Sequence, residues 1–442
     1  MALPITIPYT FATATTSIPL SQLDADFSTI YATVNGIGNG TVALSNVAIS
    51  GGNGTFTNIT SPASTNLTIQ SASTTALTID TSQNVTAVGT LAMGSSFKRN
   101  RIINGNMLID QRNAGASVTP TDGQYLTDRF VAGLTAASKF TAQQSSTAPT
   151  GFSNSLLITS SSAYSVSASD AFTVGQKIEG FNFADLMWGT ASAATVTLSF
   201  WVRSSLTGTF GGAITNSAGD RSYPFSYTIS AANTWEQKSV TIAGDTSGTW
   251  IGSTNGIGAR VWFGLGVGTT YSGTAGAWVG SPKVSATGAV SVVGTSGATF
   301  YITGVQLEVG TKATPYEMQI YSDQLAQCQR YCYRPAINSA YSWLSSGGGF
   351  QSTTTGLAQG SFPVTMRAVP TSLVLDTATL SNYALYQGAS FLTVTALSLN
   401  SVSTASNYSI NCTVASGGAV GGFFSLATNN QTSYGLYFNA EL

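Results

Sequence analysis

A helical pattern of apolar positions opens this chain of 442 residues. Apolar residues recur there at gaps of three and four, the spacing of one helical face: Leu20, Leu23, Phe27, Ile30, Val34 and Ile37. Ser21 and Asp24 have the spacing of a capping box, and Gly36, Gly38 and Gly40 interrupt the pattern. We predict a helix of about 14 residues, too short to be stable alone in water.

The apolar face of this helix needs a partner. It can pack on its own domain, or it can join copies of the chain in a short coiled coil. We expect self-association, because no adjacent segment offers a matching apolar face. The six apolar residues are the predicted oligomerisation contacts of an N-terminal region covering residues 1–40.

Between residues 41 and 97 the pattern changes to a period of two. Asn66–Gln70 and Ala76–Asp80 repeat at an interval of ten residues, and Thr41–Leu44 and Val85–Val88 resemble degenerate copies. Strands this short cannot make a core within one chain, so we predict a β-repeat shaft built from several chains side by side. A flexible Ser/Thr linker is the alternative.

Residues 126–317 have the pattern of a β-sandwich. Apolar residues alternate with other residues through Val196–Arg203 and through Arg260–Val267, which places one face of each strand in a core. The opposite faces carry a tryptophan and an arginine in each strand: Trp201, Arg203, Arg260 and Trp262. If the two strands are neighbours, the indoles form a platform for a sugar ring, with guanidinium donors for its hydroxyl groups. Packing under a loop or against another subunit is the alternative.

The segments around the sandwich carry weaker signals. Residues 98–125 begin with a basic cluster, Lys98–Arg101, and are expected to form a solvated junction. A helix is expected in the linker 318–335, where Cys328 and Cys332 would share a face as core residues rather than metal ligands. Residues 336–442 are expected to form a separate β domain at the tip. Its candidate ligand contacts are Tyr341 and Trp343, with core or interface packing as the alternative.

The chain contains few of the side chains that serve as catalytic groups or metal ligands. The chain has no histidine and 7% charged residues, against about 25% in an ordinary soluble domain. We therefore predict no catalytic residues, no metal site and no cofactor. A net charge of -1 without a basic stripe excludes a nucleic-acid partner, and no apolar stretch is long enough for membrane insertion. Three cysteines and an N-terminus without a basic region indicate neither a disulfide framework nor a signal peptide.

Several segments resemble proteins of bacteriophage tail fibres. Ile18–Phe27 is similar to the opening of many phage tail and fibre proteins. Other segments resemble the start and end of the jelly-roll head of phage fibres and related prophage proteins, and its usual C-terminal domain: Asn100–Met107, Ile109–Gly115, Asp128–Phe130, Gln306–Gly310, Ala313–Glu317, Cys328–Tyr331, Phe362–Pro370 and Ala440–Leu442. These motifs look architectural, so the resemblance supplies no binding residue.

The resemblance implies a homotrimeric virion fibre of mainly β fold, with a short N-terminal helical anchor, a β-repeat shaft, a carbohydrate-binding-module-like jelly roll and a C-terminal β tip domain. Its N-terminus would attach to a phage tail or capsid protein. The expected function is non-enzymatic binding of bacterial surface glycan during adsorption. Such virions are assembled in the host cytoplasm and released by lysis.

Two other functions stay open. A glycan-depolymerising tailspike needs two carboxylates about 5–10 Å apart, depending on the stereochemistry of the reaction. Six acids could supply such a pair: Asp170, Glu179, Asp185, Asp220, Glu236 and Asp245. The repeat region is too short for the long β-helix that such spikes usually carry. A purely structural appendage on the capsid or tail is the other possibility.

Overall fold

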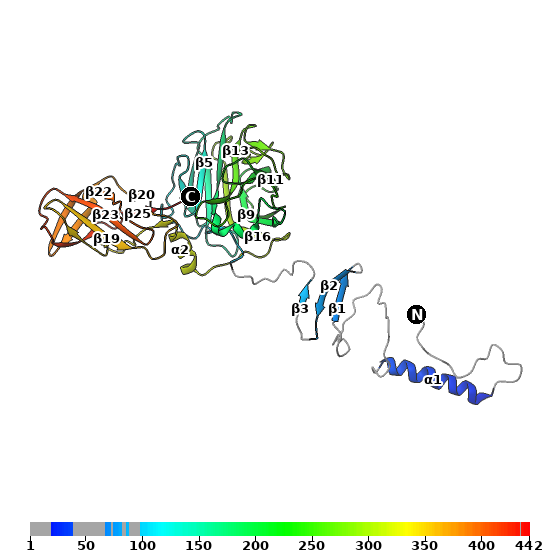
Figure 1. The fold of residues 1–442 in the computed structure, drawn as a ribbon. Helices are drawn as coiled ribbons and strands as arrows, with labels where there is room; N and C mark the ends of the chain where they lie inside the picture. The colour runs from blue at the N-terminus through cyan, green and yellow to red at the C-terminus, as the bar shows by residue number, and fades with distance from the viewer. Residues whose placement is uncertain (1–18, 39–66, 72–73, 82–84, 88–97, 434) are drawn as a thin grey trace. The chain divides into compact units, whose positions relative to one another are not determined.

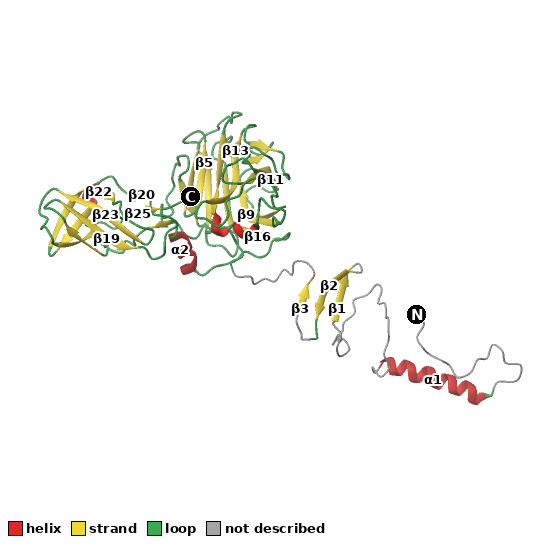
Figure 2. Cartoon of the chain, viewed as in Figure 1, coloured by secondary structure: helices red, strands yellow, loops and turns green. Residues whose placement is uncertain are grey.

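The computed structural model describes residues 19–38, 67–71, 74–81, 85–87, 98–433 and 435–442. The chain forms two compact units, Met1–Leu91 and Ala92–Leu442. The described residues are mainly β, as predicted, with two α-helices among many strands (Figures 1 and 2). None of the helices among these residues is long and apolar enough to cross a membrane.

The first unit contains the predicted helix. Helix α1 covers Leu20–Gly38, so Ser21 lies inside it rather than capping it. The described part of the predicted apolar face is exposed in the single chain: Leu20, Leu23, Phe27, Ile30 and Val34. The side chain of Ile37 lies outside the description. A surface helix normally buries its apolar face. Because the structure contains a single chain, the predicted association between chains stays a prediction.

The described strands of the predicted shaft form one small antiparallel sheet. It consists of β1 (Leu67–Ser71), β2 (Thr74–Ile79) and β3 (Val85–Ala87), with β2 in the middle. Leu67 lies opposite Ile79, which in turn lies opposite Val85. The repeat copies that were recognised at Leu67 and Ala76 therefore pair with each other. The copy predicted at Thr41–Leu44 lies outside the described residues.

Two facing sheets form the sandwich of the second unit. The six-stranded sheet has the order β11 (Ser222–Ile229), β10 (Gly208–Thr215), β13 (Ile257–Val267), β8 (Ala171–Glu179), β5 (Phe130–Leu134) and β4 (Tyr125–Thr127). The five-stranded sheet has the order β12 (Glu236–Ile242), β9 (Val196–Ser204), β16 (Thr299–Val309), β7 (Ser155–Ser160) and β6 (Phe140–Ser145). The loops of the sandwich contain a short parallel strand pair, β14 (Ser272–Gly273) and β15 (Ser285–Ala286). They also contain two 3-10 turns, η2 (Gly180–Asn182) and η3 (Ala184–Leu186). The chain crosses repeatedly between the two sheets, as in a jelly roll.

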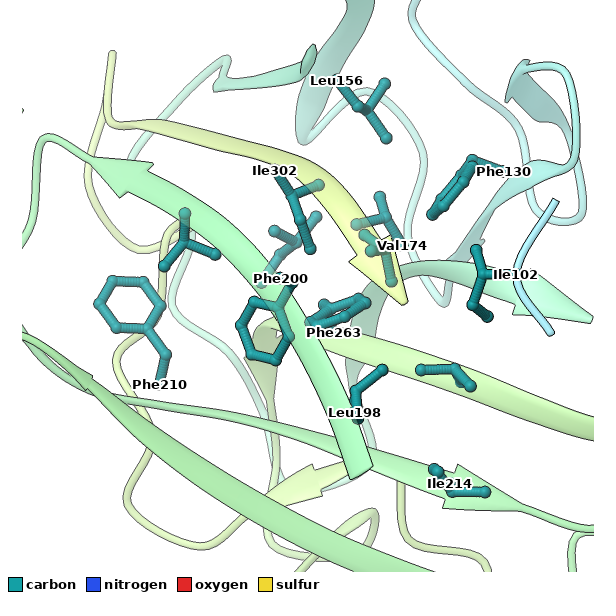
Figure 3. Close-up of a cluster of buried hydrophobic side chains, with 14 of the residues drawn as sticks. Ile102, Phe130, Leu156, Val174, Leu198, Phe200, Phe210, Ile214, Phe263 and Ile302 are labelled. Atoms are coloured by element: carbon teal, nitrogen blue, oxygen red, sulfur yellow. The ribbon is translucent and has the colours of Figure 1, made fainter. Parts of the chain in front are cut away.

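The core of the sandwich lies between the two sheets. The residues that point into it, as the alternating pattern predicts, are Val196, Leu198, Phe200 and Val202 of β9 and Val261, Phe263 and Leu265 of β13. Val267 of the predicted pattern is only half-buried, because the register of β13 shifts between Gly264 and Gly266. Figure 3 shows Phe200 and Phe263 side by side in this core, and their ring centroids are 4.9 Å apart in an edge-to-face contact. Truncating one such buried ring to alanine costs about 3–5 kcal/mol.

The segment 98–125 is part of the sandwich. Ile102 and Met107 are fully buried in its core. Arg99 forms an ion pair of 3.4 Å with Glu308, and its side chain is 12% exposed. The expectation of a solvated basic cluster at a junction was wrong for Arg99 and Arg101, which pair with Glu308 and Asp185 of the sandwich, whereas Lys98 is exposed.

Helix α2 covers Tyr321–Gln329 and connects the sandwich to the last domain. It ends before Cys332, which lies in β17 (Cys332–Tyr333), so the two cysteines do not share one helical face. Both thiols are fully buried, Cys328 beside Ile103 and Tyr331. Among the described residues no three metal-ligating side chains lie together.

A closed six-stranded barrel forms most of the C-terminal β domain. Its strands follow the order β18 (Gly347–Phe350), β19 (Thr355–Ser361), β23 (Asn407–Val414), β22 (Ser390–Leu399), β21 (Tyr383–Gln387) and β24 (Phe423–Thr428). A second sheet beside the barrel has the order β17, β25 (Leu436–Asn439) and β20 (Ser372–Leu375). A 3-10 turn, η4 (Leu380–Asn382), precedes β21. Closure leaves the barrel without free strand edges.

Buried charges attach the end of the chain to the sandwich. The guanidinium of Arg129 is fully buried, forms an ion pair with Glu441, and lies 3.6 Å from the ring centroid of Tyr331. Arg112 donates to the other carboxylate oxygen of Glu441 at 2.8 Å. A second pair joins Arg330 to Glu179 of β8 at 2.6 Å. Four of the recognised motifs thus meet here, which supports an architectural role for them.

Candidate functional site

The two predicted tryptophans lie on opposite sides of the sandwich. Trp201 belongs to β9 in the five-stranded sheet and Trp262 to β13 in the six-stranded sheet. Their neighbours Phe200 and Phe263 meet in the core, so the two indoles point away from each other. The condition for a joint platform, neighbouring strands, is not met.

On the five-stranded sheet the aromatic and cationic groups contact their own chain. Arg203 donates from Nε to the backbone oxygen of Asn233 at 2.9 Å and lies over the ring of Tyr301. The indole of Trp201 lies so close to Gly304 that a Cβ there would be 3.1 Å from the ring. Asn233 lies in the loop between β11 and β12, so the contact of Arg203 matches the alternative of packing under a loop.

On the six-stranded sheet Trp262 lines a groove of about 410 Å³. Its floor is the outer face of β5, β8 and β13: Val131, Gly133, Thr173, Lys177, Arg260 and Trp262. One wall comes from the turn at Asp122, and another from the loops around β14 and β15, including Tyr271 and Pro282. The groove therefore combines an indole, hydroxyl groups and cations on a rigid sheet.

Two glycines make room for the indole of Trp262 on the floor of the groove. Gly175 lies directly opposite Trp262 on the adjacent strand. A Cβ at Gly175 would be 2.6 Å from Cε3 of the indole, and one at Gly133 would be 3.9 Å from Cζ3. The six-membered ring thus lies across β8 toward β5. An indole supported in this way is an ordered apolar surface beside polar groups.

Two cations lie next to the indole. Arg260 is directly opposite Lys177 on adjacent strands. Arg260 donates from Nη1 to the backbone oxygen of Asn216 at 3.0 Å, and Lys177 donates to a Leu442 oxygen at 2.5 Å. Burial lowers the pKa of both groups, and the positive charge of Arg260 lowers that of Lys177 further. Arg260 stays a cation, because a guanidinium is not deprotonated in proteins.

The groove is suited to binding a polar ring. Sugar rings present an apolar face of C–H groups and an edge of hydroxyl groups, and indole and guanidinium groups match these two surfaces. Asp122 is the only carboxylate among the described residues that line the groove, and its Oδ1 already accepts the Leu134 amide at 2.9 Å.

The predicted contacts in the last domain, Tyr341 and Trp343, are exposed. Trp343 is 61% exposed and makes an isolated bridge with Ala427 of β24. Tyr341 is 42% exposed, and its ring centroid is 4.8 Å from that of Phe391. The structure therefore places both on the outside of the barrel domain rather than in its core.

Sequence reasoning missed Lys177 and the glycines below Trp262. A signal was available, because β8 alternates buried Phe172 and Val174 with outward Thr173 and Lys177. The adjacency of β8 and β13 was not visible, since about eighty residues separate the two strands in the sequence.

No protein-family model matches the chain, and no curated protein matches it. Solved structures match parts of it weakly. The enzymatically active domain of tailspike protein 4 of bacteriophage CBA120 has 14% identity and a TM-score of 0.27, covering 48% of this chain and 22% of that one. A protein of Bacteroides thetaiotaomicron described as sugar-binding has 14% identity and a TM-score of 0.28, covering 48% and 100%. A carbohydrate-binding module in complex with β-1,4-galactotriose has 9% identity and a TM-score of 0.23, covering 42% and 92%. Scores this low establish no shared function, so the site rests on the geometry of this chain.

Proposed function

We propose that this chain is a non-enzymatic virion fibre protein that binds a glycan of the bacterial surface in the groove over Trp262. The observation that carries the proposal is the position of this indole, held across Gly175 at the floor of a groove of about 410 Å³. Ligand sites combine an apolar surface with a few placed polar groups. The fibre role follows the sequence resemblance of the motifs around the sandwich.

The six carboxylates considered for a depolymerase all have partners in the chain. Asp245 pairs with Arg221 at 2.7 Å, Glu179 with Arg330 at 2.6 Å, and Asp185 with Arg101 at 2.6 Å. Asp220 accepts from Asn216 at 2.6 Å, and Glu236 pairs with Lys238 at 2.5 Å. Hydrogen bonds from Ser167 lower the pKa of Asp170 to about 2. The burial of Glu179 is outweighed by hydrogen bonds from Arg330 and Tyr331, which lower its pKa, and a hydrogen bond from Lys238 lowers the pKa of Glu236. A general acid of a glycosidase needs a raised pKa, so Asp170, Glu179 and Glu236 are unsuited to that role, which supports binding rather than hydrolysis.

The exposed face of α1 supports the trimeric part of the proposal. Its described apolar residues include Phe27 at 61% and Leu20 at 75% exposure. Their three-four spacing is that of a coiled-coil seam. Three grooves on one fibre would bind a repetitive surface together, which raises avidity by about 10²–10⁴ over a single site.

An array of bacterial capsular and O-antigen polysaccharides tests the proposal with the full chain. We expect binding to at least one polysaccharide, and we expect Trp262→Ala to weaken it about tenfold or more, as for a central tryptophan of an interface. Trp201→Ala is the matched control, because it removes an indole from the opposite sheet. Thermal melting of both variants separates lost binding from lost folding.

Three results would count against the proposal. Equal binding by wild type and Trp262→Ala would place the site elsewhere. Release of reducing ends from the bound polysaccharide would favour the depolymerase. Failure to bind any polysaccharide on the array would favour a purely structural appendage.

A further inference from the structure

The floor of the groove contains two like charges in direct opposition. Arg260 and Lys177 face each other across β13 and β8, an arrangement that destabilises a sheet because like charges repel at this distance. Thr215 lies opposite Arg260 on its other side, so the next strand supplies no carboxylate. The sheet thus holds two cations that its own pairing does not neutralise.

The surrounding charges are already engaged. Arg129, which directly precedes β5, approaches Lys177 as a third cation and donates to its backbone oxygen at 2.5 Å. The carboxylate of Glu441 also acts on Lys177, but it is paired with Arg129 and Arg112. Asp122, the one carboxylate among the described lining residues, accepts a backbone amide. Arg260 forms no ion pair within the described residues, and its one hydrogen bond there is to a backbone oxygen.

We infer that the saccharide bound in this groove is anionic, with a carboxylate or phosphate group between Arg260 and Lys177 and an adjoining ring on Trp262. This inference rests on the proposed function of the groove. Arg260 and Trp262 are two residues apart on one strand and point the same way, which separates their Cα atoms by about 7 Å. Adjacent parts of one saccharide can span that distance.

The chemistry of the cations fits such a group. A guanidinium binds carboxylate and phosphate through two parallel N–H donors, and charge-assisted hydrogen bonds are about twice as strong as neutral ones. Lys177 keeps ammonium donors besides the one directed at Leu442. An anion between Arg260 and Lys177 would also reduce the repulsion between the two cations, which favours its binding.

Paired glycan probes and three variants of the full chain test this inference. Each acidic polysaccharide that binds is compared with its carboxyl-reduced form and with its dephosphorylated form. Arg260→Gln keeps a donor for the Asn216 oxygen and removes the charge, and Arg260→Lys restores the charge. Arg203→Gln is the matched control, because Arg203 is an arginine bonded to a backbone oxygen on the opposite sheet.

We expect Arg260→Gln to weaken binding of the native polysaccharide about tenfold or more, with partial rescue by Arg260→Lys and no change in Arg203→Gln. Loss of binding after carboxyl reduction identifies a carboxylate, and loss after dephosphorylation identifies a phosphate. Equal binding of native and neutralised forms, or no effect of Arg260→Gln in a folded protein, overturns the anionic ligand. In that case a continued effect of Trp262→Ala keeps the groove as the site, whereas its absence overturns the proposed function as well.

Discussion

Glu441 is predicted to be a main determinant of stability in the second unit. Its carboxylate is 3% exposed and pairs with both Arg129 and Arg112, whose side chains are 0% and 5% exposed. In Glu441→Ala, Arg112 keeps Asp128 at 3.6 Å as a partner. Arg129 keeps direct contacts with the Lys177 oxygen and the Tyr331 ring, and Glu179 acts on it only from beyond ion-pair distance. The substitution therefore leaves one fully buried cation without a direct ion-pair partner.

The expected loss of stability in Glu441→Ala follows from the one buried cation that loses its ion-pair partner. Removing one partner of a buried ion pair costs about 3–5 kcal/mol, because the remaining charge stays buried and unpaired. The pair between Glu236 and Lys238 is the matched control, since these side chains are 17% and 20% exposed. Glu236→Ala should cost about 0–1 kcal/mol.

Urea unfolding followed by tryptophan fluorescence measures both variants. Six of the seven tryptophans, all except Trp343, lie between β8 and β16 of the sandwich and its loops, so the signal reports mainly on this domain. The double variant Arg129→Met with Glu441→Ala should recover part of the lost stability, because it removes the unpaired charge. A cost below 1 kcal/mol for Glu441→Ala, or additive effects in the double variant, would refute the electrostatic argument.

Two further predictions concern other parts of the chain. Hydrogen bonds from Ser167 and others lower the pKa of Asp170 to about 2, below the ordinary value of about 3.9, so its contribution to stability is present above pH 4 and is lost as the pH falls toward 2. The difference in melting temperature between wild type and Asp170→Asn should therefore narrow over that range, and a constant difference would contradict the assigned cause. Replacing Leu23 and Ile30 with Asp should convert a trimer of the full chain into smaller species in analytical ultracentrifugation, because burying charge in an apolar seam is costly. A wild-type chain that sediments as a compact monomer would contradict the predicted trimer.

The sequence allowed most of the fold to be predicted, because its patterns are local. The two-residue period placed Val196–Val202 in a core, and the three-four spacing predicted α1. The prediction for Lys98–Arg101 was wrong for Arg99 because its partner carboxylate, Glu308, is about two hundred residues away in the sequence. A run of cations alone does not show whether counter-charges fold against it.

The sequence predicted some residues of the candidate site but not how they come together. Alternation identified the outward tryptophan and arginine of each strand, and one of these pairs, Arg260 and Trp262, lines the groove. The other pair, Trp201 and Arg203, lies on the opposite sheet. This could not be predicted, because strand alternation fixes the face of a side chain but not the sheet to which its strand belongs. The role of Gly175 could not be predicted, since a glycine below an indole has meaning only once its neighbour across the sheet is known.

The pairing of β17 with β25 would allow the barrel domain to be replaced as one continuous segment of the chain. Cys332 lies opposite Asn439 in this pair, so the chain leaves for the barrel and returns from it at adjacent points. In an antiparallel pair these points are about 5 Å apart, and a foreign domain whose own ends lie that close could be grafted there. Recombination at the two points would replace the barrel domain and keep the residues of the groove over Trp262 and Glu441, which follows the second point.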